Sequence, residues 1–290
     1  MSATFELLTN QNLITEYVDA RIKKELDHIG VFAQFSQTTI LGPQGGSGPA
    51  DFNYVRSIKS DRGFTITKTS PGAVTRFGKD IYTTDTGQVD IYTGGVELVQ
   101  ELAKVQKWEL QQDILEDMVA IAVDYYEKAL GLYLCANATD VAEAVTGSIT
   151  FPTDLLAGRK AVLDNLKRRP DVVMIASNLY DKFLAIDNFI EVDKYGGTAP
   201  LYNGEVGKLF GMRIVESPLL NALELDGTNP TADTMIFLNT ARPTLKTMMW
   251  APLFVFEAWE VKDRHVWVHE LRGYFDLYIW DDDAVRQMKI

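Results

Sequence analysis

A helical pattern of apolar residues between Val96 and Leu134 is the strongest regular feature of the chain. Apolar side chains recur there every three or four residues, and the stretch contains no proline. The spacing predicts a first helix that begins near Val96, just after a Gly-Gly pair, a break near residues 111–113, and a long helix over Gln112–Leu134. The long helix would span ~35 Å. Its apolar stripe is broad, so we expect other elements to cover it on several sides.

Two further helices are predicted, one before and one after this stretch. An amphipathic pattern over residues 7–28 predicts the first, which either docks on its own core or reaches along a neighbouring subunit. Pro152 and Thr153 open the second, with Thr153 as the expected N-cap, and Pro170 stops it. The basic run Lys167–Arg169 precedes this proline. Because cations compensate the dipole at a helix C-terminus, we favour this local role over binding of nucleic acid.

The second half of the chain has the pattern of β-strands. Val172–Ala176 is a short apolar run of β-branched character, which predicts a buried strand. A short helix follows, with Ser177 or Asn178 as its cap. Further strands are expected at Thr234–Leu238, Val261–Glu270 and Leu271–Trp280, and Met248–Phe256 is a mixed apolar run between them.

A glycine-rich run lies between the short helix and these later strands. Gly204, Gly207 and Gly211 fall within eight residues, and an alternating strand that ends at Pro218 follows them. Glycines at such spacing favour a tight turn or hairpin in which backbones approach closely.

Residues 51–95 are turn-rich and have few consecutive apolar positions. Phe64–Thr67 alternates between apolar and polar side chains, and Ser70–Gly72 reads as a turn. Such a segment buries little of its own surface, so we expect an extended hairpin that a partner supports; an irregular β-region packed on its own domain is the alternative. Before it, Leu41–Ala50 has the composition of a flexible linker and lacks a phosphate-binding motif.

The order of elements from Asp171 to Pro218 resembles the axial domain of the major capsid proteins of tailed double-stranded DNA bacteriophages. The pattern Asn-Gly-x-x-Gly-x-x-x-Gly-x-x-Ile-Val-x-Ser over residues 203–217 carries this resemblance. The closing run Glu270–Val285, with an arginine early and an alanine after the strand, is similar to the last strand of that family. The resemblance covers Val96 to the C-terminus, and residues 51–95 fit by position.

The resemblance implies an α+β chain with the Hong Kong 97 type capsid fold. Residues 1–50 would be an N-terminal arm and linker, and 51–95 the extended β-hairpin loop. Residues 96–150 and 246–290 would form a peripheral domain around a long spine helix. Residues 151–245 would form the axial domain, which meets its neighbours around the five- and six-fold axes of the shell.

Composition adds limits on compartment and ligands. The 290 residues contain a single cysteine and carry a net charge of −12. One cysteine forms no internal disulfide, so we expect assembly in the host cytoplasm. The N-terminus lacks the features of a signal peptide, and no apolar stretch is long enough for a membrane span. The acidic surface opposes tight binding of nucleic acid, although it would let a packed genome move within a container.

Candidate chemistry is sparse, and we predict no catalytic, cofactor-binding or metal site. His265 and His269 would converge on a helix, but on the expected strand they lie ~13 Å apart, too far for one metal ion. Asp281–Asp283 reads as a solvated turn, and Cys135 as a packed small hydrophobe. No hydrolase elbow of the form Gly-x-Ser-x-Gly is present. The lack of a site favours a structural protein.

The function implied by the resemblance is that of a major capsid protein located in the virion. Hexamers and pentamers of the chain would tile an icosahedral shell around double-stranded DNA, without sequence-specific DNA contacts. The arm at Met1 is short, which suggests a separate scaffold protein or none; portal and decoration proteins are further partners. Lys59, Lys68 and Lys79 match the position of a crosslinking lysine in some family members, but we predict no crosslink. An encapsulin-type nanocompartment shell is the first alternative, and an unrelated soluble α+β enzyme the second.

Overall fold

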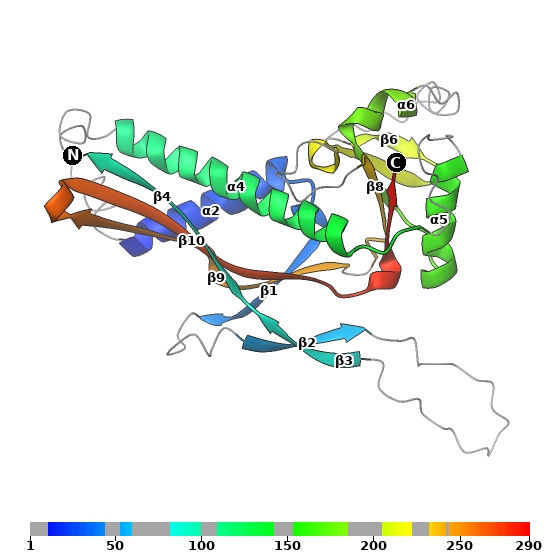
Figure 1. Cartoon of the computed structure of the whole chain (residues 1–290), viewed down its shortest axis with the longest axis horizontal. Helices are drawn as coiled ribbons and strands as arrows, with labels where there is room; N and C mark the ends of the chain where they lie inside the picture. The colour runs from blue at the N-terminus through cyan, green and yellow to red at the C-terminus, as the bar shows by residue number, and fades with distance from the viewer. Residues whose placement is uncertain are drawn as a thin grey trace, which may run out of the picture.

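The computed structural model describes residues 11–43, 53–59, 82–99, 109–141, 153–184, 205–221, 232–241 and 244–290. The two largest β-sheets lie toward opposite ends of the molecule, and one long helix runs along the larger of them (Figure 1). Most of the predicted linker (residues 44–50) and the centre of the predicted loop (residues 60–81) fall outside the described residues. Among the described helices, none is long and apolar enough to cross a membrane.

The larger sheet has four strands in the order β1-β9-β10-β4. β1 pairs with β9 in parallel, and β10 pairs antiparallel with both β9 and β4. The strands are β1 (Ser36–Pro43), β9 (Leu245–Val261), β10 (Val266–Ile279) and β4 (Asp90–Val99). The predicted linker therefore starts too early, because Leu41–Pro43 ends a strand.

The closing strands differ from the prediction in where the chain turns. Val261–Glu270 and Leu271–Trp280 were expected as two strands, but β10 runs unbroken across Glu270 and Leu271, which pair with Glu257 and Phe256 of β9. The reversal lies at the short helix η5 (Lys262–Arg264), a polar run followed by His265 in the left-handed conformation (φ 53°).

The predicted start of the first helix near Val96 is wrong, and residues 100–108, where that helix was expected to continue, lie outside the described residues. Val96 lies in β4, which pairs with β10 without interruption from Asp90 to Val99. Valine and tyrosine favour a strand, and in this segment the cross-strand partners outweigh the helical spacing. The long helix is confirmed as α4 (Glu109–Asn137), although it continues through residues 111–113 without the predicted break.

Phe275 on β10 lies at the centre of the core between α4 and the larger sheet. Its ring centroid lies 4.3 Å from that of Tyr92 on β4, 5.2 Å from that of Tyr126 on α4 and 6.3 Å from that of Phe254 on β9. Phe275 itself is fully buried. Aromatic contacts from three elements thus fix the helix on the sheet.

The N-terminal amphipathic helix is confirmed as α2 (Gln11–Ile29), and it docks on its own subunit. Val18, Ile22 and Leu26 are buried in contacts with α4 and β9. Two hydrogen bonds attach the polar side of the helix to β9: Thr15 Oγ1 donates to the carbonyl of Phe256 (3.2 Å), and Leu253 N–H donates to Asp19 Oδ1 (3.2 Å).

A buried carboxylate connects α4 to the segment between α2 and β1. Glu127 on α4 accepts hydrogen bonds from the backbone N–H groups of Val31 (3.2 Å), Phe32 (2.9 Å) and Ala33 (2.9 Å), at the start of the short helix η1 (Ala33–Phe35). Burial raises the pKa of Glu127 above its ordinary value of 4.5, and the three hydrogen bonds oppose that rise. The Glu127 carboxylate thus accepts hydrogen bonds from three backbone N–H groups.

The smaller sheet has five strands in the order β11-β8-β5-β7-β6. The predicted strands at 172–176 and 234–238 are confirmed as β5 and β8, and both are buried along their whole length. α5 (Thr153–Leu166) covers the sheet so closely that a Cβ at Gly158 would lie 2.2 Å from the ring of Phe237. The strands are β5 (Val172–Ala176), β6 (Glu205–Leu209), β7 (Met212–Ser217), β8 (Thr234–Leu238) and β11 (Val285–Lys289).

Two local details of this sheet depart from expectation. β11 was not predicted, because its short sequence carries arginine, glutamine and lysine beside two apolar residues. The predicted Ser177 or Asn178 cap is wrong: η3 (Ser177–Leu179) begins after Ala176 without a side-chain cap and leads into α6 (Tyr180–Leu184). Asn178 instead donates its backbone N–H to Asn221 Oδ1 (3.1 Å).

The predicted glycine-rich hairpin is confirmed as β6–β7. Phe210 (φ 51°) and Gly211 (φ 82°) form its turn, and two successive positive φ angles define the turn type that suits a two-residue hairpin. Gly204 lies outside the described residues.

A separate hairpin lies on the side of the larger sheet opposite α4 (Figure 1). β2 (Asn53–Lys59) and β3 (Tyr82–Gln88) pair antiparallel to form it. Val89 then separates β3 from β4, so the hairpin is continuous with the edge of the sheet.

We predict that Glu127→Ala destabilises the fold by roughly 2–4 kcal/mol, because three backbone N–H groups lose their acceptor in a buried position. Urea unfolding followed by circular dichroism measures the loss. Asp117→Ala on the exposed side of the same helix is the control and should change the free energy of unfolding little. Equal stabilities of the two variants would contradict the assigned role of Glu127.

We also predict a pH dependence with a definite sign. Since the pKa of Glu127 is higher in the folded state, the folded chain binds more protons than the unfolded chain above pH 4.5. The contribution of Glu127 to the free energy of unfolding therefore falls as pH rises above 4.5. Wild type should lose stability relative to Glu127→Gln as pH rises above 4.5. Parallel pH profiles would contradict the prediction.

Candidate assembly surfaces

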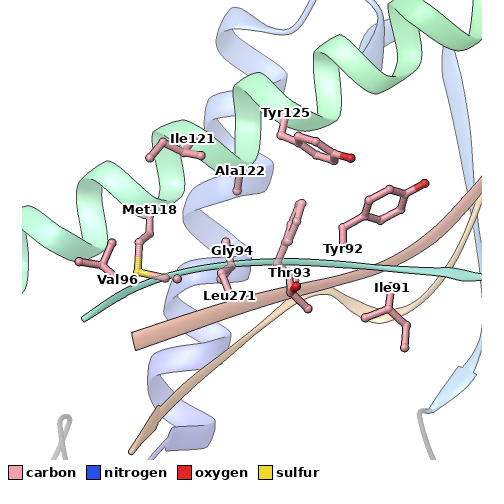
Figure 2. A pocket seen from close by; sticks show the side chains of 12 residues that line it. Ile91, Tyr92, Thr93, Gly94, Val96, Met118, Ile121, Ala122, Tyr125 and Leu271 are labelled. Carbon is pink, nitrogen blue, oxygen red and sulfur yellow. The ribbon is translucent and has the colours of Figure 1, made fainter. Parts of the chain in front are cut away.

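An apolar cleft lies between α4 and the edge strand β4 (Figure 2). Its volume is about 520 Å³. Gly94 and Val96 of β4 form one wall, and Met118, Ile121 and Tyr125 of α4 form the other. Val96 is 42% exposed, Tyr125 45% and Ile121 65%. Large apolar side chains are thus left in contact with water along a continuous groove.

A glycine pair explains why this cleft stays open. A Cβ on Gly94 would meet no atom within 4 Å, so the strand leaves room beside the helix at this point. A Cβ on Gly95 would lie 2.8 Å from the carbonyl oxygen of His269, which shows that β4 and β10 approach closely there. Tyr92 and Tyr125, with ring centroids 5.4 Å apart, close one end of the cleft.

The cleft runs beside a free strand edge. β4 is the last strand in the sheet order, and no other strand of the described residues pairs with its second edge. Its pairing with β10 has no bulge, and the β4 side chains that line the cleft carry no charge. Natural proteins protect exposed edges with charges, prolines or bulges. β4 has no proline and no bulge over Asp90–Val99, and its two charges, Asp90 and Glu97, lie on either side of the cleft-lining stretch. An edge of this kind is suited to a partner.

Acidic groups lie on the elements that form the apolar cleft. Asp117 and Asp124 are exposed and flank Ile121 at helical spacings, while Asp90 lies near Tyr92. Burial, together with the charge of Asp90, raises the pKa of Tyr92 to about 12. The phenol therefore remains protonated at neutral pH, and the negative charge around the cleft comes from carboxylates.

Charged side chains cross the opposite face of the sheet. Arg272 on β10 contacts Glu270 (2.7 Å) and Glu257 on the neighbouring strand (3.2 Å). The hydrogen bond that Arg272 donates to the Glu270 carboxylate raises the pKa of Arg272, so the guanidinium keeps its charge. This arginine is the one that the closing run has in common with the resembled family.

The two histidines considered for a metal lie in different settings. His265 lies in the exposed turn after η5, whereas His269 is buried in β10 and burial lowers its pKa. Nδ1 of His269 has no hydrogen-bond partner. Within the described ranges, no group of three or more His, Cys, Asp or Glu residues could hold a metal ion.

The remaining candidate side chains take part in local structure. Cys135 is buried, and burial raises its pKa to about 11, so it packs as a thiol. Asp282 accepts a hydrogen bond from Thr139 Oγ1 (3.0 Å), and Asp283 lies 3.7 Å from Arg286. The predicted solvated turn therefore also connects the end of α4 to β11, although Asp281 is buried.

The basic residues singled out in the sequence have separate positions. Lys167 ends α5 with a positive φ of 57° and donates Nζ to the carbonyl of Asp164, which supports the predicted role at the helix C-terminus. Lys59 is the last residue of β2. Lys68 and Lys79 lie outside the described residues, so the possible crosslink positions stay untested.

Sequence reasoning missed the cleft. The Gly94-Gly95 pair favours a helix start by its position before Val96, although glycines beside β-branched residues also mark a close approach within a strand. The apolar stripe of α4 is broad, and this breadth is the available signal that part of it stays uncovered.

Comparison with known proteins identifies the family. A family model described as phage capsid protein matches residues 83–286, more than half of the chain. No curated protein matches the chain.

Solved structures of similar fold include phage capsids and an encapsulin complex. The capsid of Cyanophage P-SCSP1u is 13% identical with a TM-score of 0.63, covering 90% of this chain and 88% of that chain. The mature capsid of bacteriophage PhiM1 is 14% identical with a TM-score of 0.56, covering 90% and 86%. The holo-SrpI encapsulin complex from Synechococcus elongatus PCC 7942 is 11% identical with a TM-score of 0.61, covering 91% and 89%.

At these identities the structural likeness shows the fold alone. It confirms the predicted α+β fold of the Hong Kong 97 capsid type. The match to the family model extends from β3 to the start of β11 and includes the cleft, three strands of the larger sheet (β4, β9 and β10) and most of the smaller sheet. On this evidence, the chain belongs to the phage capsid protein family.

Proposed function

We propose that copies of this chain assemble as hexamers and pentamers into an icosahedral shell that holds double-stranded DNA. Membership of the family makes the chain a structural protein of the viral capsid, located in the virion, and not an enzyme. The capsid structures that it resembles imply self-assembly into a multimeric shell.

The observation that carries the proposal is the apolar cleft beside the free edge of β4. Contiguous exposed apolar surface marks an interaction site, and the edge strand of a sheet offers backbone donors and acceptors to a partner. A contact between two different surfaces of identical copies repeats around a ring and closes by symmetry. The apolar cleft and the free edge of β4 would together form one of the two surfaces in such a contact.

The proposed domains are those that the resemblance to capsid proteins implies. Residues 96–150 and 246–290 would form the peripheral domain and 151–245 the axial domain, with 1–50 as arm and linker and 51–95 as the extended loop. β2 and β3 form a hairpin of two strands, which is marginally stable without further support. We propose that the extended loop overlaps an adjacent copy and gains that support there.

The proposed partners follow from charge and composition. A net charge of −12 is compatible with DNA that is packaged without sequence-specific contacts and is free to move. Scaffold, portal and decoration proteins would join the shell, which would assemble in the host cytoplasm. The single buried Cys135 requires no oxidising compartment.

A nanocompartment shell is the second candidate. The TM-score of 0.61 to the SrpI encapsulin complex supports it, because both kinds of shell use this fold. The phage capsid family model favours the viral shell.

Sedimentation of the purified chain followed by electron microscopy tests the proposal. We expect closed shells or ring-shaped capsomers, and DNA in particles isolated from an infected host. Small uniform particles filled with protein would favour the nanocompartment. A chain that stays monomeric with its phage scaffold and host factors present would overturn the proposal.

We predict that Ile121→Lys blocks assembly without unfolding the chain. The side chain is 65% exposed, so its replacement should leave the unfolding temperature within a few degrees of wild type. In the shell the same side chain would be covered, and loss of its burial, ~1.5–3 kcal/mol, should weaken the contact at least about tenfold. Sedimentation velocity measures the assembled fraction.

Ala136→Lys is the matched control, because it adds the same charge to an exposed position of the same helix, away from the cleft. This variant should assemble as wild type does. Normal assembly of Ile121→Lys would show that the cleft is not an assembly contact.

A further inference from the structure

The base of the β2–β3 hairpin is attached to the body of the chain through both of its strands. On one side, β3 passes into β4 through Val89, which is 1% exposed. On the other side, Tyr54 of β2 donates its hydroxyl to Asp276 Oδ2 of β10 at 2.6 Å. A single attachment would leave the hairpin free to pivot, whereas attachments on both strands at the same end define its direction.

Gly87 determines where the Tyr54 ring lies. The two residues are opposite each other in the β2–β3 ladder, and Gly87 is buried. A Cβ on Gly87 would lie 2.5 Å from the nearest ring carbon of Tyr54 and 2.7 Å from its hydroxyl oxygen. The ring therefore lies across the glycine, which directs the hydroxyl toward the sheet. Any larger residue would displace it.

The acceptor lies on a well-supported part of the sheet. Asp276 is half-buried on β10, pairs with Met248 of β9 and directly follows Phe275, the centre of the core. A phenol that donates to a carboxylate at this distance makes a charge-assisted hydrogen bond, roughly twice as strong as a neutral one. The contact thus connects a hairpin of two strands to β10, which is paired with a strand on each side.

We propose that Tyr54, Gly87 and Asp276 form a junction that sets the direction of the hairpin relative to the larger sheet, and thereby the angle at which neighbouring copies meet. This inference rests on the proposed function, since the angle matters only if the hairpin contacts another copy. In a closed shell, the angle between adjacent copies determines whether and at what size the ring of contacts closes.

Tyr54→Phe tests the junction, because it removes the hydroxyl and keeps the ring. Hydrogen exchange of the unassembled chain, read by mass spectrometry, should show amides of residues 53–59 and 82–88 exchanging about ten- to a hundredfold faster, as expected for loss of a hydrogen bond to a charged group. Amides of β5 should not change. Gly87→Ala should give the same pattern through displacement of the ring, and Asp276→Asn a weaker one.

Tyr17→Phe is the control, since it removes a hydroxyl from an exposed tyrosine on α2. It should match wild type in exchange and in assembly. The second measurement is the diameter distribution of assembled particles by electron microscopy. We expect a broader distribution, or open shells, for Tyr54→Phe and Gly87→Ala.

The two measurements separate the possible failures. Exchange within about twofold of wild type in Tyr54→Phe would overturn the junction itself. Faster exchange with an unchanged particle diameter would overturn its role in setting the angle. If the wild-type chain formed no shells in any context, the proposed function would fail and with it the role in the angle, while the exchange data would still decide whether the contact holds the hairpin.

Discussion

The packing of α4 on the four-stranded sheet is the interaction on which the rest of the structure depends. Phe275 contacts rings from α4, β4 and β9, so one side chain joins the helix to the centre and the edge of the sheet. Glu127 attaches the segment between α2 and β1 to the other side of the same helix. Without α4, the sheet would lose one covered face, and α2 and β1 would lose their support.

The same packing leaves part of the sheet uncovered, and the function follows from that part. α4 covers β10 and β9 closely, but beside β4 the two glycines and the tilt of the elements leave an apolar cleft and an unpaired strand edge (Figure 2). A chain that acts alone would bury such a surface or protect it with charges. In a protein that assembles with copies of itself, apolar surface that one subunit leaves exposed is buried against the next subunit.

Much of the fold follows from short-range patterns in the sequence. The apolar spacing of α4 and the β-branched run of β5 decide their structure locally, and the glycine-rich hairpin follows from its turn. Sequence patterns gave no correct prediction where pairing with residues distant in the chain determines the secondary structure. Val96–Val99 satisfies a helical spacing but pairs with β10, and β11 is a strand because it lies beside β8. The cleft depends on the distance between α4 and β4, and the Glu127 and Tyr54 contacts join residues far apart in the chain, so no local pattern contains them.

Hydrogen exchange of the same chain before and after assembly tests the central claim most directly, namely that the cleft and the free edge of β4 are a contact between copies. The account predicts that amides of residues 90–99 gain strong protection in the assembled particle, while those of β5 at 172–176, which are already buried and paired, do not change. Assembled shells in which the amides of β4 exchange as fast as in the free chain would contradict the account.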